Sequence, residues 1–160
     1  MGLDKNIILI MDITTQVTQL LEQAKDQIQS AMSANNINAS GRTSDSFHVI
    51  SGDGHIMLVM GGEGTAPLAT LEVGRSEGKV PYGFTDILLE WSKAKGISFP
   101  DERMRKTFAW FLGRRIAEQG TLRHKNHVDI YSTIVHYTVE QLKSGIVQAV
   151  KDHFPEKRTT

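Results

Sequence analysis

One run near the start of the chain, residues 6–34, contains no glycine or proline and repeats apolar side chains at steps of three and four. That spacing predicts one long helix with a single apolar stripe. At about 1.5 Å per residue it would span roughly 40 Å, well beyond the usual helix of about eleven residues. Such a helix needs a partner along its stripe, from its own chain or from another copy. The stripe comprises Ile10, Ile13, Val17, Leu20, Leu21, Ala24, Ile28, Ala31 and Met32.

A β-hairpin is predicted after this helix. The runs Phe47–Ser51 and His55–Met60 are rich in β-forming residues, and Gly52-Asp53-Gly54 lies between them. Two such runs around a short glycine-containing loop are typical of a hairpin.

The remainder of the chain predicts helices. Residues 67–73 read as a short helix, 75–83 as a loop, and 86–95 as a helix capped by Thr85. Helices are also expected at 101–119, opened by Pro100-Asp101 and ended by Gly120, and at 130–152. Each of the two has an apolar face. The first face comprises Met104, Phe108, Phe111, Leu112 and Ile116; the second comprises Ile134, Val135, Val139, Leu142, Ile146 and Val150. We therefore expect one α+β domain at 1–154, with a long N-terminal helix, a small antiparallel sheet or hairpin and C-terminal helices, and a flexible tail at 155–160.

Composition excludes several classes of protein. The chain has 160 residues, enough for one domain with a core, and it has no cysteine. Disulfide scaffolds, thiol nucleophiles and thiolate zinc sites are therefore ruled out. No run of about eighteen apolar residues occurs, so no membrane-spanning helix is expected.

Catalytic signatures are weak throughout. His124, His127 and Asp129 form a candidate set of metal ligands, but Arg123 and Lys125 beside them oppose a bound cation. The glycine-rich residues 61–65 lack the lysine of a phosphate loop and are followed by Ala-Pro. We expect no enzyme activity, no catalytic, cofactor-binding or metal-binding residue, and no small-molecule substrate; a metal-dependent enzyme at the histidine cluster is the weakest alternative.

Charge is distributed unevenly although its sum is zero. Residues 1–80 carry five Lys and Arg against nine Asp and Glu, a net −4, and residues 81–160 carry thirteen against nine, a net +4. Opposite charges of this kind favour contact between neighbouring copies. Scatter over a solvated surface explains them equally well. The basic region 93–125 also suggests a second function, a small nucleic-acid-associated protein.

The order of short motifs resembles the tailed-bacteriophage neck and tail-completion family, which includes minor tail components. Residues 40–47, Ser-Gly-Arg-Thr-Ser-Asp-Ser-Phe, resemble the family's small-residue joint Thr-Gly-Arg-Leu-x-x-Ser between a long helix and a strand. Residues 66–74 resemble its Tyr-Ala-x-x-x-Glu-x-Gly segment and keep Glu72 and Gly74. Residues 91–97 and 109–121 resemble a helical insertion that some members carry.

The resemblance implies a non-enzymatic virion protein of the neck or tail, assembled in the bacterial cytoplasm as a homo-oligomeric ring. Its partners would be other neck, portal or tail proteins, with incidental contact with packaged DNA and no membrane. We predict Arg42 and Glu72 as polar anchors of the joint or interface and Trp91 as an apolar anchor. A purely structural role is the alternative for each of the three.

Overall fold

The computed structural model of the chain describes residues 5–37, 40–61, 68–122 and 128–154. Residues 155–160, predicted to form a flexible tail, lie outside these ranges. So do His124 and His127 of the candidate metal set and most of the glycine-rich residues 61–65.

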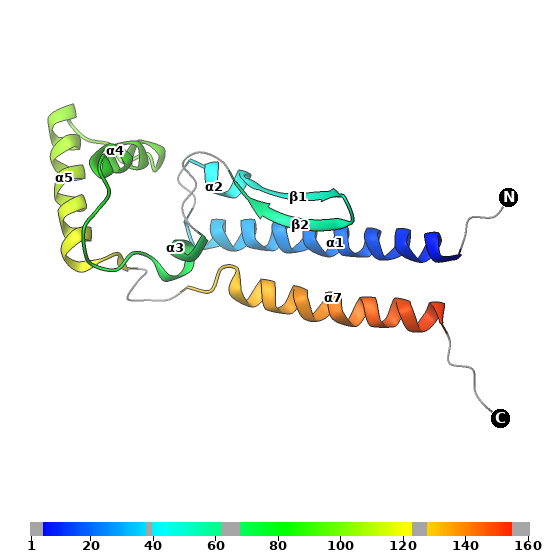
Figure 1. Ribbon diagram of the computed structural model, residues 1–160. Helices are drawn as coiled ribbons and strands as arrows, with labels where there is room; N and C mark the ends of the chain where they lie inside the picture. Colours follow the sequence, from blue (N-terminus) through cyan, green and yellow to red (C-terminus); the bar gives the residue numbers. More distant parts are fainter. Residues whose placement is uncertain (1–4, 38–39, 62–67, 123–127, 155–160) are drawn as a thin grey trace, which may run out of the picture.

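Two long helices form the length of the molecule. Helix α1 spans Lys5–Ala34 and helix α7 spans Ser132–His153. They run antiparallel and in contact, so the two chain ends lie at the same end of the molecule (Figure 1). The predicted long N-terminal helix is confirmed, and another segment of its own chain packs along it.

The predicted hairpin is also confirmed and lies against α1 (Figure 1). Strand β1, Phe47–Gly52, pairs antiparallel with β2, His55–Met60, in a register that places Phe47 opposite Met60 and Gly52 opposite His55. The two-residue loop has positive φ at both positions, 48° at Asp53 and 77° at Gly54. This conformation matches the twist of the strands and explains why the loop requires Asp-Gly.

The hydrophobic core lies at the end of α1 that is distant from the chain termini. Ile28 and Met32 of α1 are buried there with Phe47 of β1 and Ile130, which precedes α7. Short helix α3, Leu68–Val73, lies nearby, as predicted for this segment (Figure 1). Toward the chain termini the packing thins, and among residues 7–23 every side chain is half-buried or exposed.

A second group consists of α4, Phe84–Ala94, and α5, Glu102–Gln119, which pack against each other. Asp101 caps α5 by accepting a hydrogen bond from the Met104 N–H at 2.7 Å. The predicted start of α4 was wrong, because Gly83, with φ of 74°, turns the chain into the helix two residues earlier than a Thr85 cap would.

The predicted apolar stripe of α5 was partly wrong. Its buried residues are small ones, Ala109 and Gly113, and a Cβ on Gly113 would lie 3.4 Å from Leu88 Cδ1. The missing side chains allow α4 to approach closely. Met104 and Phe111 are consequently left exposed, at 52% and 59%.

The segment that contains α4 and α5 leaves the stem and returns to it, and hydrogen bonds join the residues where it begins and ends. Thr121 donates its N–H to the Arg75 carbonyl at 2.8 Å, and the Arg75 N–H donates to Thr121 Oγ1 at 2.9 Å. Gly78 adds a bond to the Ala117 carbonyl at 2.8 Å. We call residues 75–122 the head and the remaining described residues, 5–37, 40–61, 68–74 and 128–154, the stem. Helices with one antiparallel sheet make the fold α+β, as expected.

Candidate functional site

Glu72 ties two distant parts of the stem together. Its Oε1 accepts the N–H groups of Ile130 at 2.9 Å, Tyr131 at 2.5 Å and Ser132 at 2.7 Å, and the Ser132 hydroxyl donates to Oε2. These amides belong to the first turn of α7 and its approach, where helical N–H groups lack partners. Tyr131, the N-cap residue, supplies no side-chain cap, so Glu72 of α3 caps α7 from about sixty residues away in sequence.

The charge of Glu72 suits this place. Burial raises the pKa of the Glu72 carboxyl, but the hydrogen bonds from the Ser132 side chain and from the backbone of residues 130–132 outweigh it and leave the pKa below its ordinary value. A helix N-terminus also favours a negative charge. Glu72 is 7% exposed, so all of these contacts lie within the chain.

Arg42 lies in the short helix α2, Arg42–Asp45, where it connects the stem to the head. Its Nη2 lies 3.5 Å from Glu90 Oε2 on α4, and both side chains are more than half exposed. Trp91, the next residue on α4, is half-buried. Lys95 makes a second link by donating from Nζ to the Asn36 carbonyl at 2.8 Å.

The three predicted anchors therefore occupy two places. Arg42 reaches the helix that carries Trp91, whereas Glu72 belongs to the cap of α7. The structure contains a single copy of the chain, so the interface roles of Arg42 and Trp91 stay predictions. The Glu72 carboxylate has a structural role in the stem.

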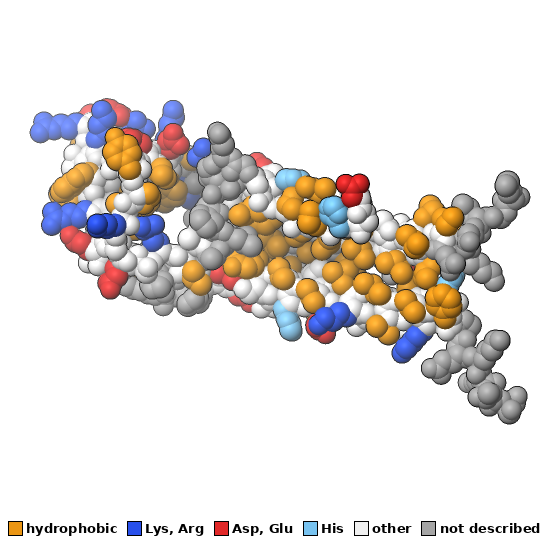
Figure 2. All heavy atoms as spheres, in the orientation of Figure 1, with side chains coloured by type: hydrophobic (Ala, Val, Ile, Leu, Met, Phe, Trp, Pro, Cys, Tyr) orange, Lys and Arg blue, Asp and Glu red, His pale blue; other side chains and the backbone are white. Residues whose placement is uncertain are grey.

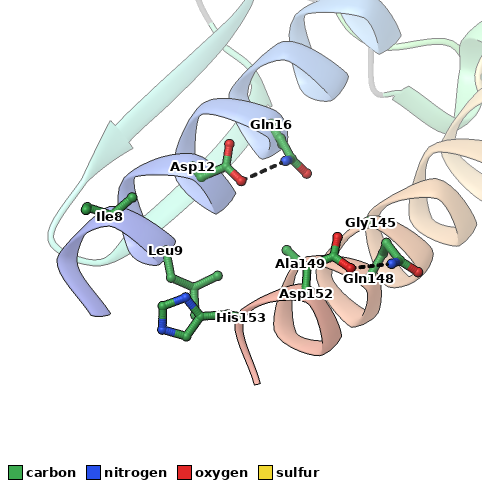
Figure 3. Close-up of a pocket in the computed structure, with 9 residues that line it drawn as sticks. All are labelled: Ile8, Leu9, Asp12, Gln16, Gly145, Gln148, Ala149, Asp152 and His153. Atoms are coloured by element: carbon green, nitrogen blue, oxygen red, sulfur yellow. Dashed lines mark hydrogen bonds between the residues drawn. The ribbon is translucent and has the colours of Figure 1, made fainter. Parts of the chain in front are cut away.

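A groove between α1 and α7 was not anticipated from the sequence. It has a volume of about 520 Å³ and opens near the chain termini (Figure 3). Asp12 and Asp152 lie in its lining, one on each helix, and each accepts a hydrogen bond from a glutamine of its own helix, Gln16 at 3.1 Å and Gln148 at 2.7 Å. Its remaining lining is Ile8, Leu9, Gly145, Ala149 and His153.

The surface around the groove is strongly apolar, and hydrophobic side chains gather over the stem in Figure 2. On α1, Ile10 is 63% exposed and Met11 is 58% exposed. On α7, Val147 is 52% exposed, and Phe154 beyond its end is 60% exposed. Of these four residues, Ile10 belongs to a predicted apolar stripe, whereas Met11, Val147 and Phe154 lie outside the predicted stripes. The sequence did not show that apolar side chains of both helices remain uncovered within one chain.

The outer face of α5 presents a different surface. Trp110 and Phe111 are 51% and 59% exposed, and their rings meet edge-to-face with centroids 4.9 Å apart. The Arg114 guanidinium lies 5.8 Å from the centre of the Trp110 ring. Lysine and arginine side chains gather at this end of the molecule in Figure 2.

The described residues contain no group of three acidic, histidine or cysteine side chains placed to hold a metal ion. Asp129, the described member of the predicted set, accepts hydrogen bonds from the Thr133 N–H at 3.2 Å and from its hydroxyl. Within the described ranges, no helix is both long and apolar enough to cross a membrane.

Comparisons with protein-family models, with curated proteins and with solved structures found no match to this chain.

Proposed function

We propose that this chain is a structural subunit of a tailed-phage virion, a head–tail connector or tail-completion protein that assembles into a homo-oligomeric ring. We assign it no catalytic activity and no cofactor. The virion assignment rests on the resemblance of the motif order around Arg42 and Glu72. The proposal that the chain assembles rests on the surface that a single copy leaves uncovered.

The observation that best supports assembly is the amount of solvent-accessible surface that one copy leaves exposed. The accessible surface is 11537 Å² for a chain of 17.8 kDa. A compact monomer of this mass exposes about 8,000 Å², so the excess is about 3,500 Å². Treating the 23 residues outside the described ranges as fully extended chain would explain about 2,800 Å² of this excess, which leaves about 700 Å².

The remaining excess is close to one side of a standard interface and about half of what the two contacts of a ring subunit would cover. A standard interface removes about 800 Å² from each partner, and a ring subunit makes two such contacts through different faces. The exposed residues of the stem include large apolar ones such as Ile10, Met11 and Val147, and apolar surface is enriched in permanent interfaces.

The test is to measure the size of the purified full-length protein. Sedimentation velocity over a range of concentrations should show a species many times the monomer mass, and negative-stain images should show closed rings. A protein that stays monomeric at every concentration would refute the ring.

A second candidate function is nucleic-acid association. It is supported by the exposed Trp110 beside Arg114 and by neighbouring exposed arginines such as Arg103 and Arg115. Against it, Arg105 and Arg114 pair with Glu102 and Glu118 of the same helix, both at 2.8 Å. Binding of single-stranded DNA that weakens steeply with salt would favour this function, and no binding at low salt would remove it.

A further inference from the structure

We propose that the outer face of α5 in one copy docks into the α1–α7 groove of the next copy, in a head-to-groove contact. This inference rests on the proposed ring and names the two surfaces that form it. The docking face consists of Met104, Trp110, Phe111 and Arg114.

The chemistry of the two surfaces is complementary. The groove combines apolar Ile8, Leu9 and Ala149 with the carboxylates of Asp12 and Asp152. The α5 face combines two aromatic rings with the Arg114 guanidinium. Arg114 pairs with Glu118 of its own helix at 2.8 Å, and because both side chains are exposed, docking would exchange this partner for a groove carboxylate at little cost. Carboxylates held in place by glutamines suit arginine, and an apolar floor suits the rings.

Net charge follows the same division. The stem carries five Lys and Arg against nine Asp and Glu, a net −4, whereas the head carries nine against six, a net +3. The charge asymmetry along the sequence thus becomes a stem of net negative charge and a head of net positive charge, and Figure 2 shows lysine and arginine side chains gathered at the head. A contact between unlike ends is favoured, and one between like ends is opposed.

The molecule's shape prevents the head of one copy from filling its own groove, so a head in the groove must come from another copy. The head lies at one end of the stem and the groove lies near the chain termini at the other end (Figure 1). Pairing two grooves face to face would bring the Asp12 and Asp152 carboxylates of both copies together, which is repulsive. A head-to-groove contact uses two different surfaces, and its repetition generates a ring when the rotation closes.

The groove also has a suitable size. Its volume of about 520 Å³ lies within the range of about 300–1,000 Å³ for sites that enclose drug-sized molecules, which a pair of aromatic side chains resembles in bulk. The edge-to-face pairing of Trp110 and Phe111 holds both rings in a fixed arrangement before contact. Tryptophan and arginine are also enriched among the residues that dominate binding energy.

Two single variants of the full-length protein test the contact. Phe111→Glu places a carboxylate on the head, and Ile8→Glu adds one to the groove; both positions are more than half exposed, so both variants should fold. Each variant alone should associate at least about tenfold more weakly than the parent and sediment as a monomer. Mixed in equal amounts, they retain one intact head and one intact groove, so they should form a 1:1 dimer that cannot extend.

Tyr82→Glu, at a fully exposed loop position, is the matched control and should assemble as the parent does. Helix content by circular dichroism checks folding, and Met104→Glu replaces Phe111→Glu if the latter unfolds. Assembly of either groove or head variant at parental strength overturns the contact while leaving the ring in place. An equal mixture of the two variants that remains monomeric also overturns the contact and leaves the ring in place. A parent protein that is itself monomeric overturns both the contact and the ring.

Discussion

At the scale of single residues, Glu72 carries the most structural weight of the three predicted anchors. Its buried carboxylate holds the start of α7 against α3 by accepting the N–H groups of Tyr131 and Ser132, while Asp129 accepts the next one, from Thr133. Glu72 lies in a segment that resembles a family motif, but its contacts in this chain serve the fold, because they join the start of the C-terminal helix to the stem.

Replacing Glu72 should lower the free energy of unfolding. Glu72→Ala leaves the N–H groups of residues 130–132 without their acceptor, at a cost of about 2–4 kcal/mol. Glu72→Gln keeps one acceptor and loses the charge, so about half of that cost is expected. Denaturant unfolding at one fixed protein concentration measures both, with exposed Glu77→Gln as control. An Ala variant within about 0.5 kcal/mol of the parent would contradict the cap.

The pKa of Glu72 predicts a pH dependence. Because its folded-state pKa is lower than the ordinary 4.5, the stabilisation is complete above about pH 4.5 and is lost as the pH falls toward the folded value. The parent should therefore lose more stability than Glu72→Gln between neutral pH and acid. Unfolding curves measured across that range compare the two, and parallel pH profiles would exclude the charged cap.

Arg42 should matter for assembly and little for folding. Its pair with Glu90 is exposed on both sides, and exposed pairs contribute about 0–1 kcal/mol. Arg42→Ala is therefore expected to keep the parental unfolding transition while weakening self-association. Sedimentation velocity measures the second effect, and unchanged assembly would remove Arg42 from the interface.

At the scale of elements, two helical glycines mark different packing. Gly113 of α5 faces α4 tightly, with Leu88 Cδ1 3.4 Å from the position of an added Cβ. Gly145 of α7 faces α1 with more room, since its nearest neighbour would be Gln16 Oε1 at 3.8 Å. The helices of the head are in close contact, whereas those of the stem leave the groove open beside Gly145.

This difference predicts that glycine-to-alanine substitution stabilises more at position 145 than at position 113. Gly145→Ala should raise the free energy of unfolding by about 0.5–1 kcal/mol, because alanine favours the helix and has space. Gly113→Ala should gain less or lose stability, because Leu88 must move to admit the methyl group. Thermal unfolding compares the pair, and a stabilising Gly113→Ala with a destabilising Gly145→Ala would reverse the assignment.

At the scale of the whole molecule, one copy is built as a stem with a partial core and a basic head. Ile28, Met32, Phe47 and Ile130 anchor one end of the stem, while the two long helices extend beyond that core with uncovered apolar faces. The two helices and the hairpin cover only part of these apolar faces, and our proposal is that neighbouring copies cover the rest.

Salt should weaken assembly without abolishing it. Raising the ionic strength from about 0.05 M to about 0.5 M screens the attraction between the basic head and the acidic stem, while apolar contacts persist. The apparent dissociation constant from sedimentation should therefore rise with salt. Self-association that is insensitive to salt would remove the electrostatic part of the contact and leave the apolar part.

The sequence by itself determined the elements whose signals are local. Uninterrupted apolar spacing predicted α1, the Asp-Gly loop predicted the hairpin, and Asp101 with Gly120 marked the ends of α5. Only the tertiary structure decided which faces are buried. Helical periodicity identifies an apolar stripe but not what covers it, so the burial of Ala109 and Gly113 in place of Phe111 was not foreseen. The contact of Glu72 with α7 joins residues about sixty positions apart, and no local pattern encodes such a pairing.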